Sequence, residues 1–280
     1  MFASSGNEGR PLLMGILNLT PDSFSDGGRY LDVEVASAMA AHMVAAGANI
    51  IDVGGESTRP GALAVTAALQ LERVLPVISE LHKRLPATVA ISIDTRSVDV
   101  ARAALQTGAR IVNDISAGGD AGMFETVAAH SAGIVLMHMQ GSPATMQDAP
   151  HYDDVTSEVR AFLLKRAHAA EAAGIPHHNI ALDPGIGFGK TQAHNLRLLA
   201  TLDELVVCGY AVLLGTSRKR FMGAICSESD AQELLGATCA TTALGVAAGV
   251  RIVRVHDVKA NRQAADIAWA IDAERLTAPR

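Results

Sequence analysis

Short apolar runs rich in β-branched residues alternate with helix-like stretches along almost the whole sequence, and this alternation constrains the fold more than any other feature. The runs have the length of buried strands, whereas the stretches between them carry alanines and apolar residues at helical spacing. Strands that alternate with helices pair in parallel through right-handed crossovers. The predicted strands cover residues 12–18, 49–56, 89–96, 110–116, 133–141, 179–187, 211–219 and 250–258, and the predicted helices cover 33–48, 67–85, 97–109, 121–132, 157–174, 192–205, 231–249 and 260–275.

Eight strand-then-helix units in a chain of 280 residues predict an α/β fold, the single-domain (β/α)8 or TIM barrel. An open, doubly wound sheet is the alternative, but it would normally carry a GxGxxG turn after its first strand, and none occurs there. No linker, charge run or low-complexity tract divides the chain. We therefore expect one domain over residues 1–280, with residues 1–10 as a flexible N-terminal tail.

The composition argues against several classes of protein. No apolar stretch reaches the roughly 18–20 residues of a membrane span, and the start of the chain lacks the apolar core of a secretory signal. The net charge of −6 argues against nucleic acid as a general partner. Cys208, Cys226 and Cys239 have neither CxxC spacing nor an even number, so we expect free thiols in a reducing, cytoplasmic compartment and no zinc site.

Every predicted strand ends in polar or ionisable residues, and the active site of such a barrel lies at these carboxyl ends. Asp94 or Asp183 alone could equally be the cap of the next helix. Eight such ends aimed at one mouth instead favour a ligand site. The ends are Asn18; Gly54, Gly55 and Glu56; Asp94; Asn113 and Asp114; His138; Asp183; Ser217 and Lys219; and Arg254, His256 and Asp257.

Asp94, Asn113 and Asp183 form a group of hydrogen-bond acceptors, which suits a heterocycle with an N–H-rich edge. The two carboxylates could instead be a general acid–base pair or metal ligands. Met137 and Phe188 lie close by in the sequence and offer an apolar surface for a ring, although both could simply be core residues.

Four potential cations at strand ends of an acidic protein indicate an anionic ligand. Arg254 and His256 alternate on a strand that should be buried on both faces, so they share one face. Arg218 and Arg220, by contrast, are expected to be solvated surface residues. No Walker A pattern occurs, so phosphate recognition would come from side chains and loop amides. The four cations are Arg59, Lys219, Arg254 and His256.

Seven segments together are similar to the sequences of bacterial dihydropteroate synthases. They occur in that family's order and extend from Asn18 to Asp257, so the joint signal is specific, whereas a single piece such as SIDT is weak. The resemblance implies a (β/α)8 enzyme of folate synthesis that joins 6-hydroxymethyl-7,8-dihydropterin diphosphate to 4-aminobenzoate and releases 7,8-dihydropteroate and diphosphate. The segments are NLTPDSFSDGG, GGESTRPG, SIDT, MHMQG, DPGIGFGK, SRKRF and RVHD.

The resemblance also implies a role for each site residue. Asp183 would accept hydrogen bonds from the amino and ring N–H groups of the pterin, Arg254 would cover the pterin face, and the apolar Met137 and Phe188 remain candidates for contact with the ring. The residues expected in the pterin pocket are Asp94, Asn113, Asp183 and Lys219, and those expected to carry the catalysis are Asp94, Lys219, Arg254 and His256.

The diphosphate and 4-aminobenzoate would have contacts of their own. Arg254, His256 and Asn18 would hold the diphosphate and its Mg²⁺, with Asn18 as the metal ligand. Residues 18–28 would form a mobile lid that orders over bound diphosphate. The residues expected around 4-aminobenzoate are Thr58, Arg59, Pro60, Ser217 and, in the lid, Phe24.

The family is thought to react in a dissociative way, so that the diphosphate leaves with help from Mg²⁺ before the aniline nitrogen attacks. The resemblance suggests a homodimer formed by helices away from the barrel mouth. A pterin-binding methyltransferase module and a non-catalytic pterin-binding protein are the alternatives. Neither of them needs a diphosphate grip such as that expected from Arg254 and His256.

Overall fold

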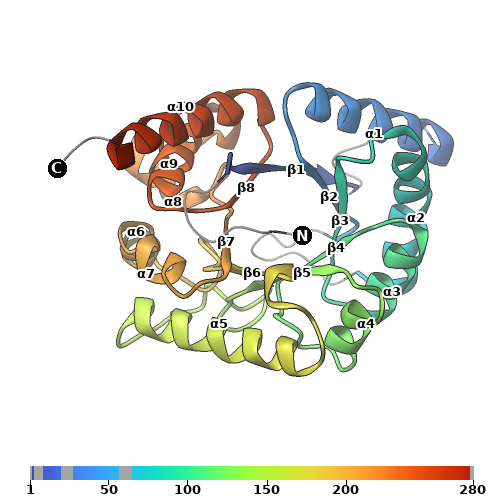
Figure 1. The fold of residues 1–280 in the computed structure, drawn as a ribbon, viewed down its shortest axis with the longest axis horizontal. Helices are drawn as coiled ribbons and strands as arrows, with labels where there is room; N and C mark the ends of the chain where they lie inside the picture. Colours follow the sequence, from blue (N-terminus) through green and yellow to red (C-terminus); the bar gives the residue numbers. More distant parts are fainter. Residues whose placement is uncertain (1, 3–8, 20–27, 57–64, 278–280) are drawn as a thin grey trace.

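The computed structural model describes residues 2, 9–19, 28–56 and 65–277. Eight parallel strands pair in sequence order, and the last pairs with the first, so that they form a closed barrel (Figure 1). The predicted TIM-barrel fold is confirmed. The strands are β1 (Leu12–Asn18), β2 (Ile50–Gly54), β3 (Ala90–Asp94), β4 (Ile111–Asp114), β5 (Gly133–Met137), β6 (Ile180–Asp183), β7 (Ala211–Leu214) and β8 (Ile252–Val255).

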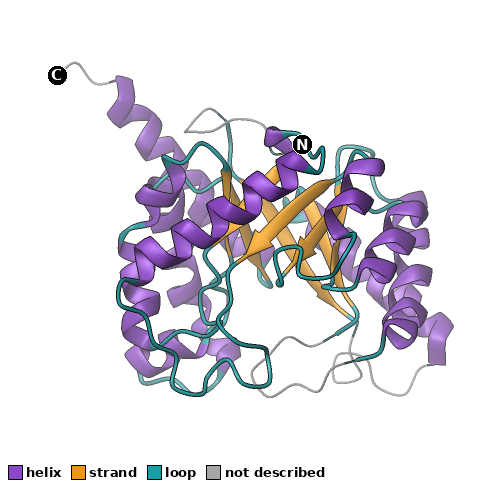
Figure 2. Ribbon diagram, turned by 90° about the horizontal axis from the view of Figure 1, so that it is seen from below, coloured by secondary structure: helices purple, strands orange, loops and turns teal. Residues whose placement is uncertain are grey.

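Helices surround the strands on all sides, as seen along the barrel in Figure 1 and from the side in Figure 2. Within the described part of the chain, no helix is both long and apolar enough to cross a membrane. The helices are α1 (Gly28–Ala45), α2 (Ala67–Arg84), α3 (Val98–Thr107), α4 (Met123–Ala129), α5 (Val155–Ala172), α6 (Gln192–Ala200), α7 (Leu202–Val206), α8 (Arg220–Cys226), α9 (Leu235–Ala247) and α10 (Val258–Thr277).

The element boundaries differ from the sequence prediction at a few points. The stretch 192–205, predicted as one helix, is divided into α6 and α7 at Thr201, whose backbone has φ −122° and ψ 27° and so leaves the helical conformation. The stretch 231–249 begins with a short 3-10 helix, Ala231–Leu234, before α9. Helix α8 was missed because its seven residues are too few to show a helical period.

The interior of the barrel is apolar where the strands begin and polar where they end. Residues two apart on a strand point to the same side, so each strand contributes apolar residues first and polar ones later. A separate outer core fills the space between the strands and the helices. The buried residues of the inner apolar cluster are Phe2, Met14, Ile50, Ile111, Val135, Ala181, Leu213 and Ile252.

The N-terminal segment contributes to this inner cluster. Phe2 is only 1% exposed, and its backbone N–H donates to the carbonyl of His178 at 3.0 Å, just before β6. Arg10 Nε donates to Asp266 Oδ1 in α10 at 2.7 Å. At these two positions the chain is anchored, in contrast to the free tail expected over residues 1–10. Phe2 was overlooked because nothing in its sequence neighbourhood shows that a side chain fills the end of the barrel where the strands begin.

Candidate active site at the carboxyl ends of the strands

Three of the predicted site residues lie at one level of the barrel. Asn18 pairs in register with Gly54, Gly54 with Asp94, and Asp94 with Asn113, across β1 to β4. Gly54 has no side chain at this level, and a Cβ atom there would be in van der Waals contact with Asn18 Oδ1, at 3.4 Å, and with Asp94 Cβ, at 3.6 Å. The strand register therefore brings an amide, a carboxylate and a second amide around one side of the mouth.

Asp183 and Met137 form the next part of the wall, in register on β6 and β5. Asp183 is 6% exposed, and its Oδ1 accepts the backbone N–H of Gly185 at 2.7 Å. Gly185 has φ +65°, and a Cβ there would lie 1.9 Å from the carbonyl oxygen of His138, so only glycine fits this turn. Burial raises the pKa of Asp183, although the Gly185 N–H and Lys219 oppose the shift.

Lys219 and Phe188 face each other beside these acceptors. The Lys219 ammonium lies 4.0 Å from the centre of the Phe188 ring, in the geometry of a cation–π contact. Burial lowers the pKa of Lys219 to about 8, while Asp183 raises it and Arg254 lowers it. The pKa lies just above neutral pH, and the ammonium is therefore mostly protonated there while remaining sensitive to any change in the neighbouring charges.

Arg254 reaches from β8 into the barrel and bridges two carboxylates. Its Nε donates to Asp52 Oδ2 at 2.7 Å, and its Nη2 donates to Asp94 Oδ2 at 2.6 Å. Burial works against the charge of Arg254, but the two carboxylates outweigh it and raise the pKa of the guanidinium. Burial also raises the pKa of Asp94, to about 7, with Arg254 lowering it and Asp52 raising it. Arg254 is thus held beside the acceptors by two carboxylates, and its expected position over the pterin face stays a prediction.

Asp52 is a member of this cluster that the sequence analysis missed. Its Oδ2 also accepts a hydrogen bond from Asn113 Nδ2 at 3.0 Å, and its side chain is fully buried. A signal was present: Asp52 interrupts the apolar run NIIDVGG, in a strand that should be buried on both faces. Asp52 lies two residues before the end of β2, so a prediction drawn from the strand ends alone does not include it.

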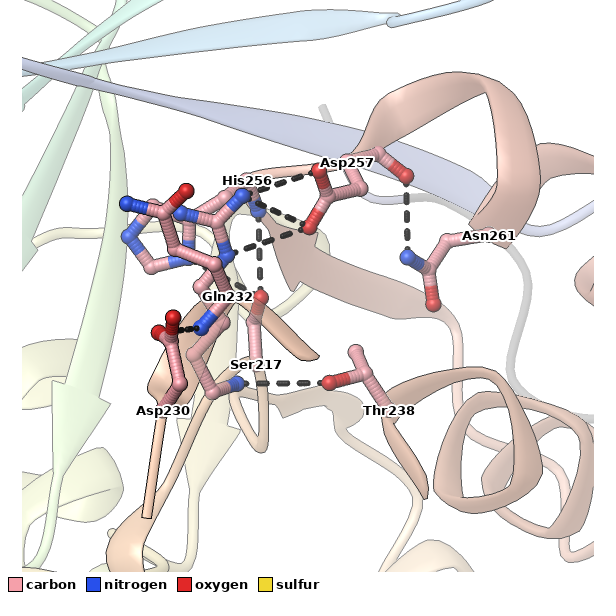
Figure 3. Close-up of polar contacts among 8 residues, drawn as sticks. Ser217, Asp230, Gln232, Thr238, His256, Asp257 and Asn261 are labelled. Carbon is pink, nitrogen blue, oxygen red and sulfur yellow. Dashed lines mark hydrogen bonds and ion pairs between the residues drawn. The ribbon is translucent and has the colours of Figure 1, made fainter. Parts of the chain in front are cut away.

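Ser217 and His256 meet on the opposite side, between the segments that follow β7 and β8 (Figure 3). Ser217 Oγ lies 2.9 Å from His256 Nδ1 and accepts the backbone N–H of His256 at 3.2 Å. Ser217 was expected at the 4-aminobenzoate and His256 at the diphosphate. Their direct contact makes them one group, so a ligand that moves one of these side chains disturbs the other.

Arg218 is less solvated than predicted, because its side chain is 29% exposed and paired with another residue. Its guanidinium forms a two-point ion pair with Asp257, with Nη2 2.9 Å from Oδ1 and Nε 3.2 Å from Oδ2. Its backbone N–H donates to Thr238 Oγ1, and its φ is +58°. The partner lies 39 residues away, so local sequence gave no hint of it. The corresponding prediction for Arg220 is confirmed, because that side chain is exposed.

Lys190 and His138 form a second pair; His138 was among the strand ends expected at the mouth, whereas no role was predicted for Lys190. Lys190 is buried, its Nζ lies 3.0 Å from His138 Nδ1, and it donates to the Phe188 carbonyl at 2.9 Å. Burial lowers the pKa of Lys190 to about 7 and that of His138 to about 3. The pair joins the segments after β5 and β6 and so fixes the backbone that carries Phe188.

Some of the predicted site lies outside the described residues, so the structure does not test it. This applies to most of the expected lid and to the residues expected around 4-aminobenzoate other than Ser217. Within the described ranges, no group of three or more His, Cys, Asp or Glu side chains could hold a metal ion. The predicted residues outside the described ranges are Phe24, Thr58, Arg59 and Pro60.

Comparison with known proteins agrees with this geometry. The family of pterin binding enzymes matches residues 14–256. The dihydropteroate synthase of Synechocystis sp. is 46% identical to this chain over 94% of it and 90% of the relative. Among solved structures, the Xanthomonas albilineans dihydropteroate synthase with 4-aminobenzoic acid has a TM-score of 0.88 and 42% identity, covering 96% of this chain and 94% of that one.

The same Xanthomonas albilineans enzyme in complex with 7,8-dihydropteroate has a TM-score of 0.84 and 39% identity, and it covers 96% of this chain and 95% of that one. The compared region extends over nearly the full length of both chains, so it includes the strand ends that form the mouth. This chain belongs to the family of pterin binding enzymes and, within it, to the dihydropteroate synthases.

Proposed function

We propose that this chain joins 6-hydroxymethyl-7,8-dihydropterin diphosphate to 4-aminobenzoate at the barrel mouth, with the residues named above in defined roles. The observation that carries the proposal is a set of buried acceptors next to two partly buried cations at the strand ends. An N–H-rich ring with an anionic tail complements both sets at once. The acceptors are Asp94, Asn113 and Asp183, and the cations are Lys219 and Arg254.

The pterin ring would bind between the acceptors. Oδ1 of Asp183 accepts the Gly185 N–H, so Oδ2 is left to accept from the amino and ring N–H groups of the pterin. Asn113 donates its amide N–H to Asp52, which leaves its carbonyl oxygen as an acceptor. Met137, at the level of Asp183, and the Lys219–Phe188 pair would border the ring.

The diphosphate would bind toward β7 and β8. Arg254 uses Nε and Nη2 on carboxylates, and its Nη1 has no hydrogen-bond partner within the described residues, so this nitrogen can donate to a phosphate oxygen. Ser217 and His256 form the neighbouring polar pair. As the C–O bond to the pterin methylene breaks, negative charge gathers on the leaving oxygen, and fixed donors at this position stabilise it.

Mg²⁺ fits the site as a companion of the diphosphate. Mg²⁺ commonly takes one or two protein oxygens and completes its shell with substrate phosphates and water. The carboxamide oxygen of Asn18 lies close to Gly54, 3.4 Å from the position that a Cβ would take there, and would serve as that protein ligand. Bound there, Mg²⁺ would neutralise part of the charge of the leaving diphosphate.

After diphosphate departure, the aniline nitrogen of 4-aminobenzoate would attack the pterin methylene and then lose a proton. The electron-rich dihydropterin stabilises the methylene cation, so no strong protein base is required. Thr58, Arg59, Pro60 and Phe24 are proposed to contact 4-aminobenzoate on the strength of the family resemblance. Ser217, next to His256, would link this substrate to the diphosphate side.

We also propose that the protein is a cytoplasmic homodimer. Leu244 on α9 is 70% exposed, and Ile267 and Ile271 on α10 are 64% and 52% exposed. These helices pack against each other, so their large exposed apolar side chains offer a surface for a second copy. The three cysteines are free thiols, in keeping with a reducing compartment. Sedimentation analysis would test the dimer: a monomer at micromolar concentration would contradict it.

A turnover assay tests the proposed reaction. The protein is mixed with pterin diphosphate, 4-aminobenzoate and Mg²⁺, and both diphosphate release and dihydropteroate formation are followed. We expect the two products in equal amounts and no net turnover without Mg²⁺. Pterin binding without diphosphate release would indicate a binding protein. Methyl transfer from a methylated pterin to a cobalamin partner, without diphosphate release, would indicate the methyltransferase alternative.

A further inference from the structure

We propose that Asp52 is a positioning residue of the pterin pocket, which determines the edges that Asn113 and Arg254 present to the ligand. The inference rests on the proposed function. Asp52 lies on β2 in register with Ser92 on β3, whereas Asp94 is in register with Gly54, two residues further along. Its fully buried carboxylate therefore lies beneath the acceptors of the mouth and would act through other side chains.

The contact with Asn113 determines which end of the amide faces the ligand. An amide side chain can offer either N–H donors or a carbonyl acceptor. Asn113 Nδ2 donates to Asp52 Oδ2 at 3.0 Å, so its carbonyl oxygen points away from Asp52. Without a carboxylate at position 52, the amide could turn and present donors to the N–H-rich edge of a pterin. Two opposed donors would leave both groups buried and unpaired, which weakens binding.

The contact with Arg254 anchors the other group. Arg254 Nε donates to the same oxygen, Asp52 Oδ2, at 2.7 Å, while Nη2 contacts Asp94. The Nε side of the planar guanidinium is thus fixed, and the terminal nitrogens are directed to Asp94 and the mouth. Because one carboxylate oxygen holds both the amide and the guanidinium, we expect their positions to be coupled.

The incomplete hydrogen bonding of the buried Asp52 carboxylate indicates that this residue does not serve fold stability. Asp52 Oδ1 is buried and has no hydrogen-bond partner within the described residues, and the same is true of the Ser92 hydroxyl at the paired position. A buried carboxylate with an unpaired oxygen is costly, and a well-packed apolar residue often serves stability as well or better. A sequence that breaks such local rules usually does so at a functional site.

Calorimetry on the whole protein tests the proposal with Asp52→Leu, which removes the accepting oxygen, and Ser92→Ala serves as the matched control from the paired position. The probe is 6-hydroxymethylpterin without diphosphate, so the binding test does not depend on turnover. We expect pterin affinity to fall about 10- to 100-fold in Asp52→Leu, the scale of a hydrogen bond to a charged group. We expect Ser92→Ala to match the wild type. Unchanged pterin affinity in folded Asp52→Leu would overturn the proposal.

Kinetics separate positioning from a general loss of structure. In Asp52→Leu, the KM for pterin diphosphate should rise, whereas the KM for 4-aminobenzoate at saturating pterin diphosphate should stay at the wild-type value. An equal rise in both would indicate a merely structural role and overturn the proposal. A wild-type protein that binds pterin but makes no dihydropteroate would contradict the proposed function and leave the calorimetric test intact.

A double-mutant cycle tests the coupling directly. If Asp52 acts through Asn113, the loss of pterin affinity in Asp52→Leu combined with Asn113→Ala should be smaller than the sum of the single losses. Additive losses would contradict the proposal. If Asp52→Leu does not fold, the wild type still provides a test by NMR. The side-chain amide protons of Asn113 should exchange slowly with solvent, and exchange as fast as that of an exposed amide would overturn the proposal.

Discussion

Replacing Asp183 by asparagine changes one oxygen into an N–H₂ group, and we expect weaker pterin binding as its main effect. Oδ1 of the present carboxylate accepts the Gly185 N–H at 2.7 Å. The carbonyl oxygen of an asparagine can keep this bond, so the tight turn at Gly185 should survive. The new amide N–H₂ then replaces Oδ2, the oxygen proposed to accept from the pterin. The ligand would meet donors where it needs an acceptor.

The expected loss of pterin affinity can be derived from the strength of one hydrogen bond, and it should also depend on pH. A hydrogen bond to a charged acceptor contributes about 1.5–3 kcal/mol, which corresponds to a loss of about 10- to 150-fold in affinity. Lys219 adds a dependence on pH. Its pKa is about 8 because burial lowers it while the Asp183 charge raises it. Removing that charge lowers the pKa of Lys219 further, so this side chain loses its proton at a lower pH than in the wild type.

Asp114 provides a matched control, since it is also a buried aspartate at a strand end. Its carboxylate accepts the backbone N–H groups of Ser116 and Gly118, both at 2.7 Å, and the Ser116 hydroxyl at 2.6 Å. These bonds hold the loop after β4 and use both oxygens. Asp114→Asn should therefore lower the free energy of unfolding while leaving pterin affinity close to that of the wild type.

Isothermal calorimetry with a pterin that lacks diphosphate is the assay, carried out at about pH 6.5 and about pH 8. Asp183→Asn should bind the pterin 10- to 150-fold more weakly, and in this variant Lys219 should already be largely neutral at the higher pH. Unchanged affinity in Asp183→Asn would refute its assignment as the pterin acceptor. An equal loss in Asp114→Asn would show that the effect comes from a damaged fold.

Three further predictions concern the grip on the diphosphate, pH and the closed end of the barrel. Arg254→Ala and His256→Ala should each lose more affinity for pterin diphosphate than for pterin alone, and calorimetry showing equal losses would argue against the diphosphate role. Pterin affinity should fall as the pH is lowered through about 7, because Asp94, whose pKa burial raises to about 7, then loses its negative charge; a profile flat between pH 6 and 8 would contradict this. Phe2→Ala should lower the free energy of unfolding in urea by about 3–5 kcal/mol, as expected for a buried aromatic truncation, with kcat unchanged. Phe2→Leu should lower the free energy of unfolding by less than about 1.5 kcal/mol. Equal stability of the wild type and both variants would contradict a packing role for Phe2 at this end of the barrel.

The fold could be predicted from sequence because its signal is local and repeated. Each strand is a short apolar run, and each following helix shows its own period, so one misjudged boundary leaves the count of units intact. Helix α8 carries too few residues to show a period, and the division at Thr201 depends on a single backbone conformation. Such details are determined by packing between elements, to which a periodic pattern is insensitive.

The site was predictable where the barrel geometry alone determines it. Asn18, Asp94 and Asn113 share one level because strand register aligns the carboxyl ends. The partnerships of Arg254 and Arg218 were not predictable. The Arg254 side chain reaches Asp52, which is 202 residues away in the sequence, and Arg218 reaches a residue 39 away. A charged residue at a strand end shows that a partner is needed, but only the folded chain shows whether that partner is a ligand or another side chain.

Before any ligand binds, the charged groups at the mouth lack enough partners to keep their ordinary pKa values. Burial raises the pKa of Asp94 to about 7 and lowers that of Lys219 to about 8, so both groups are held near their limit of ionisation at neutral pH. A pterin edge that donates to the carboxylates would lower the pKa of Asp94, and a diphosphate near Arg254 would raise that of Lys219. Because a charged Asp94 also raises the pKa of Lys219, a pterin that keeps Asp94 ionised favours the protonated Lys219 that attracts the diphosphate. Pterin diphosphate should therefore bind more tightly than the separate affinities of pterin and diphosphate imply, even after allowing for the entropy gained by linking them.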